Sequence, residues 1–134
     1  MVSQTGKYAL RILGYLAEHQ GAWVLGKDIA AATGIPANYL GKILNQLRKA
    51  GYVRSQKGWG GGFMLAPAKL RAPIAGVLEA IEGKRPDDDC VFELRRCNAK
   101  HPCPLHEHWQ RIKERYGAML DEVTIGALRG EVPQ

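Results

Sequence analysis

The sequence predicts a mainly α-helical fold, a winged helix-turn-helix with a two-stranded wing and a long C-terminal helix. The first observation is the pattern of residues 28–65, which is typical of a helix, a tight turn, a second helix and a glycine-rich hairpin. The second is an apolar stripe between residues 105 and 123 that repeats at helical spacing. The third is a concentration of basic residues in the half of the chain that holds the helix-turn-helix.

A first helix is expected to run from a cap at Ser3 or Thr5 to about Glu18, because a hydroxyl side chain can satisfy the free N–H groups of the first turn. Because this helix has an apolar face, we expect it to pack beneath the two helices that follow. That face consists of Tyr8, Ile12, Leu13, Tyr15 and Leu16. A turn then leads through Trp23, which we expect to be a packing residue, and Val24 to the next helix.

The helix-turn-helix begins with a short helix over residues 28–33 that stops at Gly34. Pro36 restarts the chain near a first helical position, where its missing N–H costs nothing, and the second helix runs to Ala50 and ends at Gly51. Apolar residues at i, i+3, i+4 and i+7 predict one buried face, made of Leu40, Ile43, Leu44 and Leu47. The opposite face carries side chains that can donate to phosphates and base edges, namely Asn38, Tyr39, Lys42, Asn45, Gln46 and Lys49.

The hairpin that follows is predicted to pair residues 52–56 with residues 63–65. Four of the six residues from Lys57 to Gly62 are glycine, so the backbone can adopt positive φ and approach another surface closely. Arg54 and Lys57 place positive charge beside that approach, as in a wing that contacts DNA. An ordinary flexible hairpin is the alternative. A P-loop is disfavoured, because no Gly-Lys-Ser/Thr follows the glycines and a strand comes next.

Composition and charge narrow the class of protein. With 134 residues and 46% hydrophobic content, the chain can bury one modest core. Residues 1–71 hold ten Lys/Arg against Glu18 and Asp28, a net charge of +8, whereas residues 72–134 carry −2. This asymmetry is typical of a polyanion binder, and a generic basic surface is the alternative. The absence of a long apolar run or a secretory h-region predicts a cytoplasmic protein without membrane partners.

Beyond the wing, a short helix is expected over residues 74–82, ending at Gly83 and followed by a polar loop. From Pro104 onward a long helix carries a coiled-coil-like seam. The seam consists of Leu105, Trp109, Ile112, Tyr116, Met119 and Val123. Such a stripe must be buried on the protein's own body or on a second copy, and we favour a homodimer because two reading heads suit a palindromic site.

Cys90, Cys97 and Cys103 form a C-x6-C-x5-C pattern, with His106 three residues after the last. Pro104 suits a first helical position, which predicts Cys103 at the N-cap and His106 in the first turn, where the helix dipole favours a thiolate. Three thiolates and one imidazole can hold an iron–sulfur cluster or a zinc ion. The lack of a tight C-x2-4-C knuckle favours the cluster, while zinc and three unligated cysteines remain alternatives. Weaker candidates are His101, which could compete as a ligand, and the surface residues His19 and His108.

The chain resembles the Rrf2 (Rrf-two) family of bacterial winged-helix regulators, which includes IscR-like and NsrR-like iron–sulfur proteins. The matching motifs are Thr5–Arg11, the reading-helix residues around Tyr39 and Leu47, the wing at 58–66, the three cysteines, and Thr124–Leu128. The resemblance implies a homodimer that binds double-stranded promoter DNA and holds a cluster in the loop before the dimerisation helix.

Residue by residue, the resemblance gives the cofactor- and metal-ligand role to Cys90, Cys97 and Cys103, with His106 as the fourth ligand, and favours a 2Fe–2S over a 4Fe–4S cluster. NsrR-like members can use an acidic residue near the N-terminus, but Lys7 stands about there in this chain. The first cysteine gap is one residue longer than the usual C-x5-C. Gly41 stands where IscR-like proteins place an acidic residue that helps to discriminate between DNA sites.

These observations predict three regions: a winged helix-turn-helix over 1–72, a linker helix with the cluster-binding loop over 73–103, and a dimerisation helix with a tail over 104–134. The expected function is a DNA-binding transcriptional regulator that senses redox state, iron–sulfur status or nitric oxide through the cluster. The expected DNA contacts are Asn38, Tyr39, Lys42, Gln46, Lys49, Arg54, Lys57, Trp59 and Gly60. No small-molecule substrate is expected.

The sequence leaves two alternative functions. A cluster-free DNA-binding regulator, controlled by a partner protein or by thiol oxidation, would need the same reading head. An enzyme that uses Cys103 and His106 as a nucleophile–base pair is disfavoured, because no oxyanion-hole motif and no third, orienting group can be named.

Overall fold

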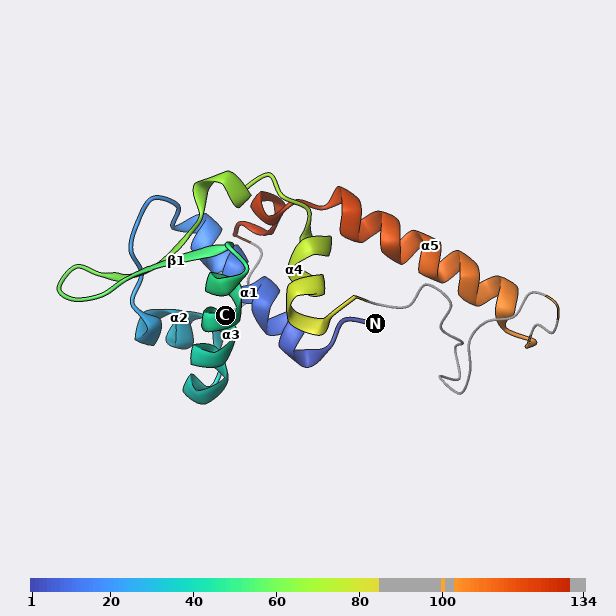
Figure 1. Ribbon diagram of the computed structural model, residues 1–134, viewed down its shortest axis with the longest axis horizontal. Helices are drawn as coiled ribbons and strands as arrows, with labels where there is room; N and C mark the ends of the chain where they lie inside the picture. The colour runs from blue at the N-terminus through green and yellow to red at the C-terminus, as the bar shows by residue number, and fades with distance from the viewer. Residues whose placement is uncertain (85–99, 101–102, 131–134) are drawn as a thin grey trace.

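The computed structural model describes residues 1–84, 100 and 103–130. Its long axis runs from the wing, at one end, to helix α5 (His106–Glu122), which extends away at the other end (Figure 1). Helix α1 (Gln4–Glu18) lies between them, at the centre of the bundle. The predicted fold class is confirmed, because the chain forms mostly helices with a two-stranded antiparallel sheet. Within the described residues, no helix is both long and apolar enough to cross a bilayer.

The first helix forms where the sequence predicted it. The Ser3 hydroxyl accepts a hydrogen bond from the Gly6 N–H at 3.0 Å, so Ser3 rather than Thr5 is the cap. Ile12 and Leu13 are completely buried, whereas the predicted face residues Tyr8 and Tyr15 are only half-buried. The core face of α1 therefore turns slightly away from its tyrosines and is completed by small residues, Ala9 and Ala17.

The helix-turn-helix consists of α2 (Gly26–Thr33) and α3 (Ala37–Lys49). Helix α2 begins two residues before the predicted start and stops as predicted at Gly34, whose φ of +72° suits glycine. All four apolar residues of α3 predicted to be buried are at most 4% exposed. The spacing of these residues thus fixed which side of α3 faces the core and which side faces outward.

The wing pairs β1 (Val53–Gln56) with β2 (Gly62–Leu65), with Val53 opposite Leu65. Val24 adds an isolated β-bridge to Phe63 that the sequence did not predict. The N–H groups of Val24 and Phe63 each donate to the other residue's carbonyl, at 2.8 and 2.7 Å. The base of the wing is therefore bonded directly to the segment that enters the helix-turn-helix.

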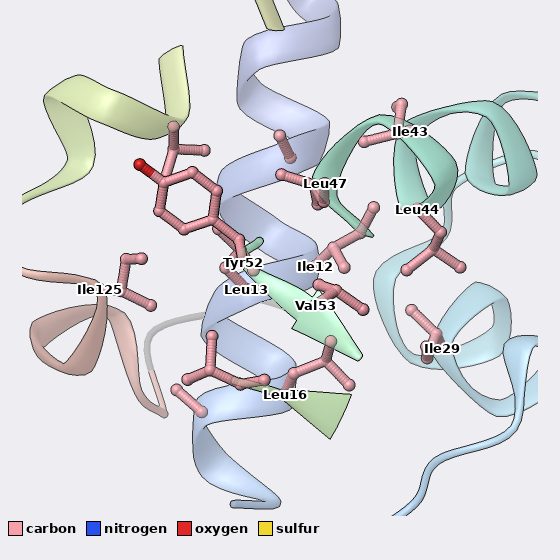
Figure 2. Packing of buried hydrophobic residues seen from close by; sticks show 14 of the residues in the cluster. Ile12, Leu13, Leu16, Ile29, Ile43, Leu44, Leu47, Tyr52, Val53 and Ile125 are labelled. Carbon is pink, nitrogen blue, oxygen red and sulfur yellow. The ribbon is translucent and has the colours of Figure 1, made fainter. Parts of the chain in front are cut away.

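Tyr52 connects this wing to helix α4 (Ile74–Glu82). Its N–H donates to the Leu47 carbonyl and its carbonyl accepts from the Ala66 N–H, both at 2.9 Å. Its ring lies in the core with the hydroxyl directed toward α4 (Figure 2), where a Cβ added at Gly76 would overlap that hydroxyl. Tyr52 thus contacts the end of α3 and the residue after β2 through its backbone, and the face of α4 through its side chain.

The burial of Tyr52 predicts an alkaline loss of stability. Desolvation, together with the nearby Glu79 carboxylate, raises the pKa of the Tyr52 phenol above its ordinary value of 10.0. The folded chain therefore holds this proton when the unfolded chain has lost it, so the contribution is complete below pH 10 and is lost as the pH rises through the higher folded-state pKa. The free energy of unfolding, measured with urea, should therefore decrease more between pH 9 and 11 in the wild type than in Tyr52→Phe. Equal losses in both proteins would contradict the prediction.

The chain returns to the core after α5. A short 3-10 helix, η1 (Pro67–Lys69), leads to α4, and a second, η2 (Ile125–Leu128), follows α5. Ile125 is completely buried and lies in the same cluster as Leu13 and Tyr52 (Figure 2). The N–H of Ile125 donates to the Ala72 carbonyl at 2.9 Å. The C-terminal turn therefore completes the core of the reading head, by which we mean α1, α2, α3 and the wing.

Helix α5 behaves differently from the other helices. None of its residues is buried, and the exposed fractions of Ile112 and Met119 are 49% and 43%. The carbonyl of Val123, at its end, accepts from the Ile74 N–H at 2.9 Å, so α5 is bound to the start of α4. Much of the predicted apolar stripe is therefore left uncovered by the residues that the structure describes.

Candidate functional site

The polar face of α3 is presented to solvent along its whole length. Every residue that the sequence placed there is exposed: Asn38, Tyr39, Lys42, Asn45, Gln46 and Lys49. The hydrophobic face of the same helix is bound into the core, so its orientation is fixed. A helix that is held in this way and that presents amide, ammonium and phenol groups can donate hydrogen bonds into a DNA major groove.

Tyr39 is the largest exposed side chain on this face, with 53% of its surface exposed. Its ring packs against that of Tyr8 in α1, with centroids 6.3 Å apart and planes at 55°. Arg11 in turn lies over the Tyr8 ring at 5.7 Å. Sequence reasoning missed Tyr8 and Arg11 as supports of the interface, although their spacing of three residues places both on one side of α1.

The N-terminal residues extend the surface beside α3. A hollow of about 820 Å³ is lined by Ser3 and Thr5 together with Tyr39, Lys42 and Gln46. The Ser3 N–H donates to a carboxylate oxygen of Glu82 at 2.6 Å, which fixes the start of α1 to the end of α4. The polar face of α3 therefore borders a concave surface rather than a flat one.

The wing tip is a closed turn that carries an exposed tryptophan. The Gly61 N–H donates to the Gly58 carbonyl at 3.0 Å, and Gly58 and Gly60 adopt φ values of +88° and +77°. A Cβ added at Gly61 would overlap the backbone carbonyl of Gln56, so this position must be glycine. Trp59 is fully exposed. The predicted wing residues Arg54, Lys57 and Gly60 are exposed as well.

A second basic surface lies between the end of α3 and the wing. Arg48, Arg54 and Lys69 border a hollow of about 570 Å³. Arg48 donates to the Asn45 side-chain oxygen at 2.8 Å, and the ammonium group of Lys69 lies 5.0 Å from the centre of the Tyr52 ring. These three cations come from three separate elements, so the positive charge predicted from the sequence is spread over the surface around the reading helix.

The start of α5 corrects one detail of the cysteine prediction. Cys103 was expected at the N-cap, but the cap is Leu105 and the first helical residue is His106. Pro104 and Leu105 form a turn instead, in which the His106 N–H donates to the Cys103 carbonyl at 3.0 Å. His106 does lie in the first turn, as predicted, and both Cys103 and His106 are half-buried.

The other proposed ligands, Cys90 and Cys97, and the weaker candidate His101 lie outside the described residues. Within the described part of the chain, no three His, Cys, Asp or Glu side chains gather closely enough to hold a metal ion. His19 and His108 are exposed, as predicted, and the His19 ring packs on Tyr15 with centroids 4.5 Å apart.

A helix-turn-helix with an exposed polar second helix, followed by a glycine-rich wing, defines the class of winged-helix transcriptional regulators. Within that class, the family model Rrf2, described as "Iron-dependent Transcriptional regulator", matches residues 2–131. The chain belongs to the Rrf2 family, which confirms the resemblance found in the sequence.

Three relatives illustrate the range of this similarity. An HTH-type transcriptional regulator of Aquifex aeolicus is 32% identical over 92% of this chain and 87% of its own length. The structure of T. potens IscR has 28% identity and a TM-score of 0.72, covering 96% of this chain and 85% of that one. The structure of CymR, the global cysteine regulator of B. subtilis, has 25% identity and a TM-score of 0.80, covering 99% and 98%.

Proposed function

We propose that this regulator binds double-stranded promoter DNA, with α3 in the major groove and the wing against the adjacent backbone or minor groove. The observation that carries the proposal is the polar face of α3, which is wholly exposed, with the basic surface of Arg48, Arg54 and Lys69 between the end of α3 and the wing. The proposed contacts are the nine residues predicted from the sequence, from Asn38 to Gly60. Tyr39, Lys42 and Gln46 lie on both the helix face and the hollow beside it, and Lys42 is the one of these three that carries a positive charge.

Selection from a random-sequence duplex library tests this proposal directly. The wild type should enrich one site, and Lys42→Ala should bind the recovered duplex with a salt dependence whose slope is smaller by about 0.9 for each lost phosphate contact. Lys27→Ala is the matched control, because Lys27 is exposed but lies on α2, outside the proposed contacts. Failure of the wild type to enrich any sequence would contradict the proposal.

We further propose that the regulator responds to redox state, iron–sulfur status or nitric oxide through a cluster ligated by Cys90, Cys97, Cys103 and His106. The donor set fits, because thiolate sulfur and imidazole nitrogen are the ligands such clusters take. Cys103 and His106 support it further, since both lie at the amino end of α5 and are half-buried. When bound, the cluster, which we assign as 2Fe–2S, would supply a redox-active centre at this place.

The residues around the cysteine segment support coupling to the reading head. Before it, Glu82 accepts the N–H of Ser3 at the start of α1. After it, α5 is bound through Val123 to the start of α4. A change in the segment would therefore act on α4, which packs against α1 and α3, and on α5, which packs against α4. A coupling of about 1–3 kcal/mol suffices for a regulatory switch.

Protein purified without oxygen from iron-replete cells is expected to be coloured and to contain iron and acid-labile sulfide. Cys103→Ala should remove the visible absorption and the iron, since one thiolate ligand is lost. His106→Ala should weaken cluster retention, because one ligand is lost. His108→Ala is the matched control, because that exposed neighbour should leave the spectrum unchanged. A colourless wild type would contradict the cluster proposal and leave DNA binding to be judged separately.

The second candidate is a cluster-free regulator controlled by a partner protein or by thiol oxidation. The similarity to CymR, named a cysteine regulator, favours it, as does the half-buried thiol of Cys103. In that case Cys103→Ser should abolish any response of DNA binding to oxidants, while iron supply should have no effect. A response to iron that depends on all three cysteines would exclude it.

We also propose that α5 forms a homodimer through its uncovered stripe. Ile112 and Met119 are 49% and 43% exposed on a helix that has no buried residue, which leaves apolar surface for a second copy. Ile112→Glu should convert the dimer to a monomer in sedimentation velocity, because a carboxylate would be buried without a partner. Arg111→Glu, one residue away, should remain dimeric. A wild-type monomer at micromolar concentration would contradict the proposal.

A further inference from the structure

The wing carries its largest side chain where no residue that the structure describes covers it. Trp59 has a relative exposure of 103%, whereas Trp23 and Trp109 are both half-buried. An indole is one of the largest apolar surfaces that a side chain can offer, so leaving it in water forgoes a favourable burial. Its position at the tip of a hairpin is therefore best explained by a partner that covers it.

The backbone that carries this ring is a closed turn rather than an open loop. The turn is closed by the hydrogen bond from the Gly61 N–H to the Gly58 carbonyl at 3.0 Å. Gly61 packs so closely on the Gln56 carbonyl that no side chain fits, and Gly61 is itself buried. The residues on either side of the ring, Gly58 and Gly60, have no side chains, so both faces of the indole stay open. A flat ring with two open faces can enter a narrow slot.

The charge around the ring indicates what kind of slot. Lys57 lies two residues before Trp59, and Arg54 lies on β1, the strand that leads into the turn; both are exposed. The wing also belongs to the half of the chain with a net charge of +8. A ring that follows two cations in the chain suits a groove lined by phosphates. The minor groove of DNA is about 6 Å wide and is the groove in which proteins insert apolar wedges that partly unstack a base step.

We propose that Trp59 acts as a wedge in the DNA minor groove, where its indole partly unstacks a base step and bends the duplex. This inference rests on the proposed DNA-binding function. It goes beyond it, because an ordinary wing contact to the phosphate backbone would neither unstack bases nor bend DNA. The side chain would then read the deformability of the sequence beneath the wing, which favours flexible pyrimidine–purine steps.

The test uses the full-length protein and a duplex of about three helical turns recovered by the wild type from the random library. Affinity is measured by fluorescence anisotropy, and bending by energy transfer between dyes at the two duplex ends. Trp59→Ala should lower affinity about tenfold to a hundredfold, the range for loss of an aromatic–base stacking contact, and should abolish the bend. Trp59→Phe should retain most of both. Because the Trp59 side chain is fully exposed, the unfolding midpoint of either variant should match that of the wild type.

Lys57→Ala is the matched control on the same hairpin. It should reduce the slope of log affinity against log salt by about 0.9 for each phosphate contact and keep the bend, whereas Trp59→Ala should keep the slope. The wedge is overturned if Trp59→Ala binds as tightly as the wild type, or if it binds more weakly and bends the duplex equally. If Lys57→Ala weakens binding while Trp59→Ala does not, only the wedge fails. If the wild type enriches no duplex, the proposed function fails with it.

Discussion

Replacing Gly61 with alanine is expected to lower DNA affinity more than any single side-chain truncation in the reading head. Gly61 does not adopt a positive φ, yet a Cβ there would overlap the Gln56 backbone carbonyl. A backbone atom cannot swing aside as a side chain can, so the hairpin neck must open and displace Lys57 and Trp59 together. Loss of a stacking contact worth about 1–3 kcal/mol together with a phosphate contact predicts a decrease of at least about a hundredfold.

Gly60→Ala separates crowding from backbone conformation. Gly60 has a φ of +77° and open space around it, so alanine there meets only the cost of a left-handed residue, about 1–2 kcal/mol. Anisotropy titrations should therefore rank affinity as wild type, Gly60→Ala and Gly61→Ala, in decreasing order. Thermal unfolding should show that both variants keep the helical core, because the wing tip does not contribute to it. Equal affinities for Gly61→Ala and the wild type would show that the wing shape is irrelevant to binding.

Replacing Gly76 with alanine is expected to lower the free energy of unfolding by about 1–3 kcal/mol, the usual cost of overpacking a core. The added methyl group would overlap the Tyr52 hydroxyl, and the next Tyr52 atom is 3.6 Å away, at ordinary contact distance. The conflict is therefore confined to one oxygen. Removing that oxygen in Tyr52→Phe should make the same alanine nearly neutral, so a double-mutant cycle by urea unfolding should reveal strong coupling.

Gly41→Ala provides the matched control for this experiment. Gly41 is also inside a helix, but it is exposed and a Cβ there meets nothing within 4 Å. Alanine at Gly41 should therefore raise stability by up to about 1 kcal/mol, through helix propensity alone. If the free energy of unfolding falls in Gly76→Ala and rises in Gly41→Ala, the Gly76 effect is assigned to packing. An additive cycle with Tyr52→Phe would show that the clash is absorbed elsewhere in the core.

The elements that repeat regularly in sequence were predicted well. The spacing of Leu40, Ile43, Leu44 and Leu47 decides which face of α3 is buried, because a helix turns every 3.6 residues and the apolar side must meet the core. The same rule leaves its polar residues outside, so the reading face follows from the buried one. Gly34, with a φ of +72°, ends α2 at the predicted place. Helix α3 ends at Lys49, one residue before the predicted Ala50, and Gly51 follows with a φ of +87°.

Contacts between distant segments were not predictable in the same way. Nothing local to Val24 shows that its N–H pairs with Phe63, because the pairing depends on where the wing lies. Ile125 looked like part of a closing motif, yet it is a core residue in the same cluster as Leu13 and Tyr52. The N-cap of α5 was misplaced because Pro104 is compatible with both a first helical position and a turn, and the chain uses the turn.

The burial of Ile125 also bears on the way the protein is made. Helix α1 and the wing are synthesised first, but the cluster around Leu13 and Tyr52 lacks one of its members until residue 125 has left the ribosome. Until then the core of the nascent chain is incomplete and part of its apolar surface stays exposed. Contacts between residues so far apart in sequence also slow folding. A premature stop anywhere in α5 would leave that surface exposed and yield a chain that proteases remove before it ever reaches DNA.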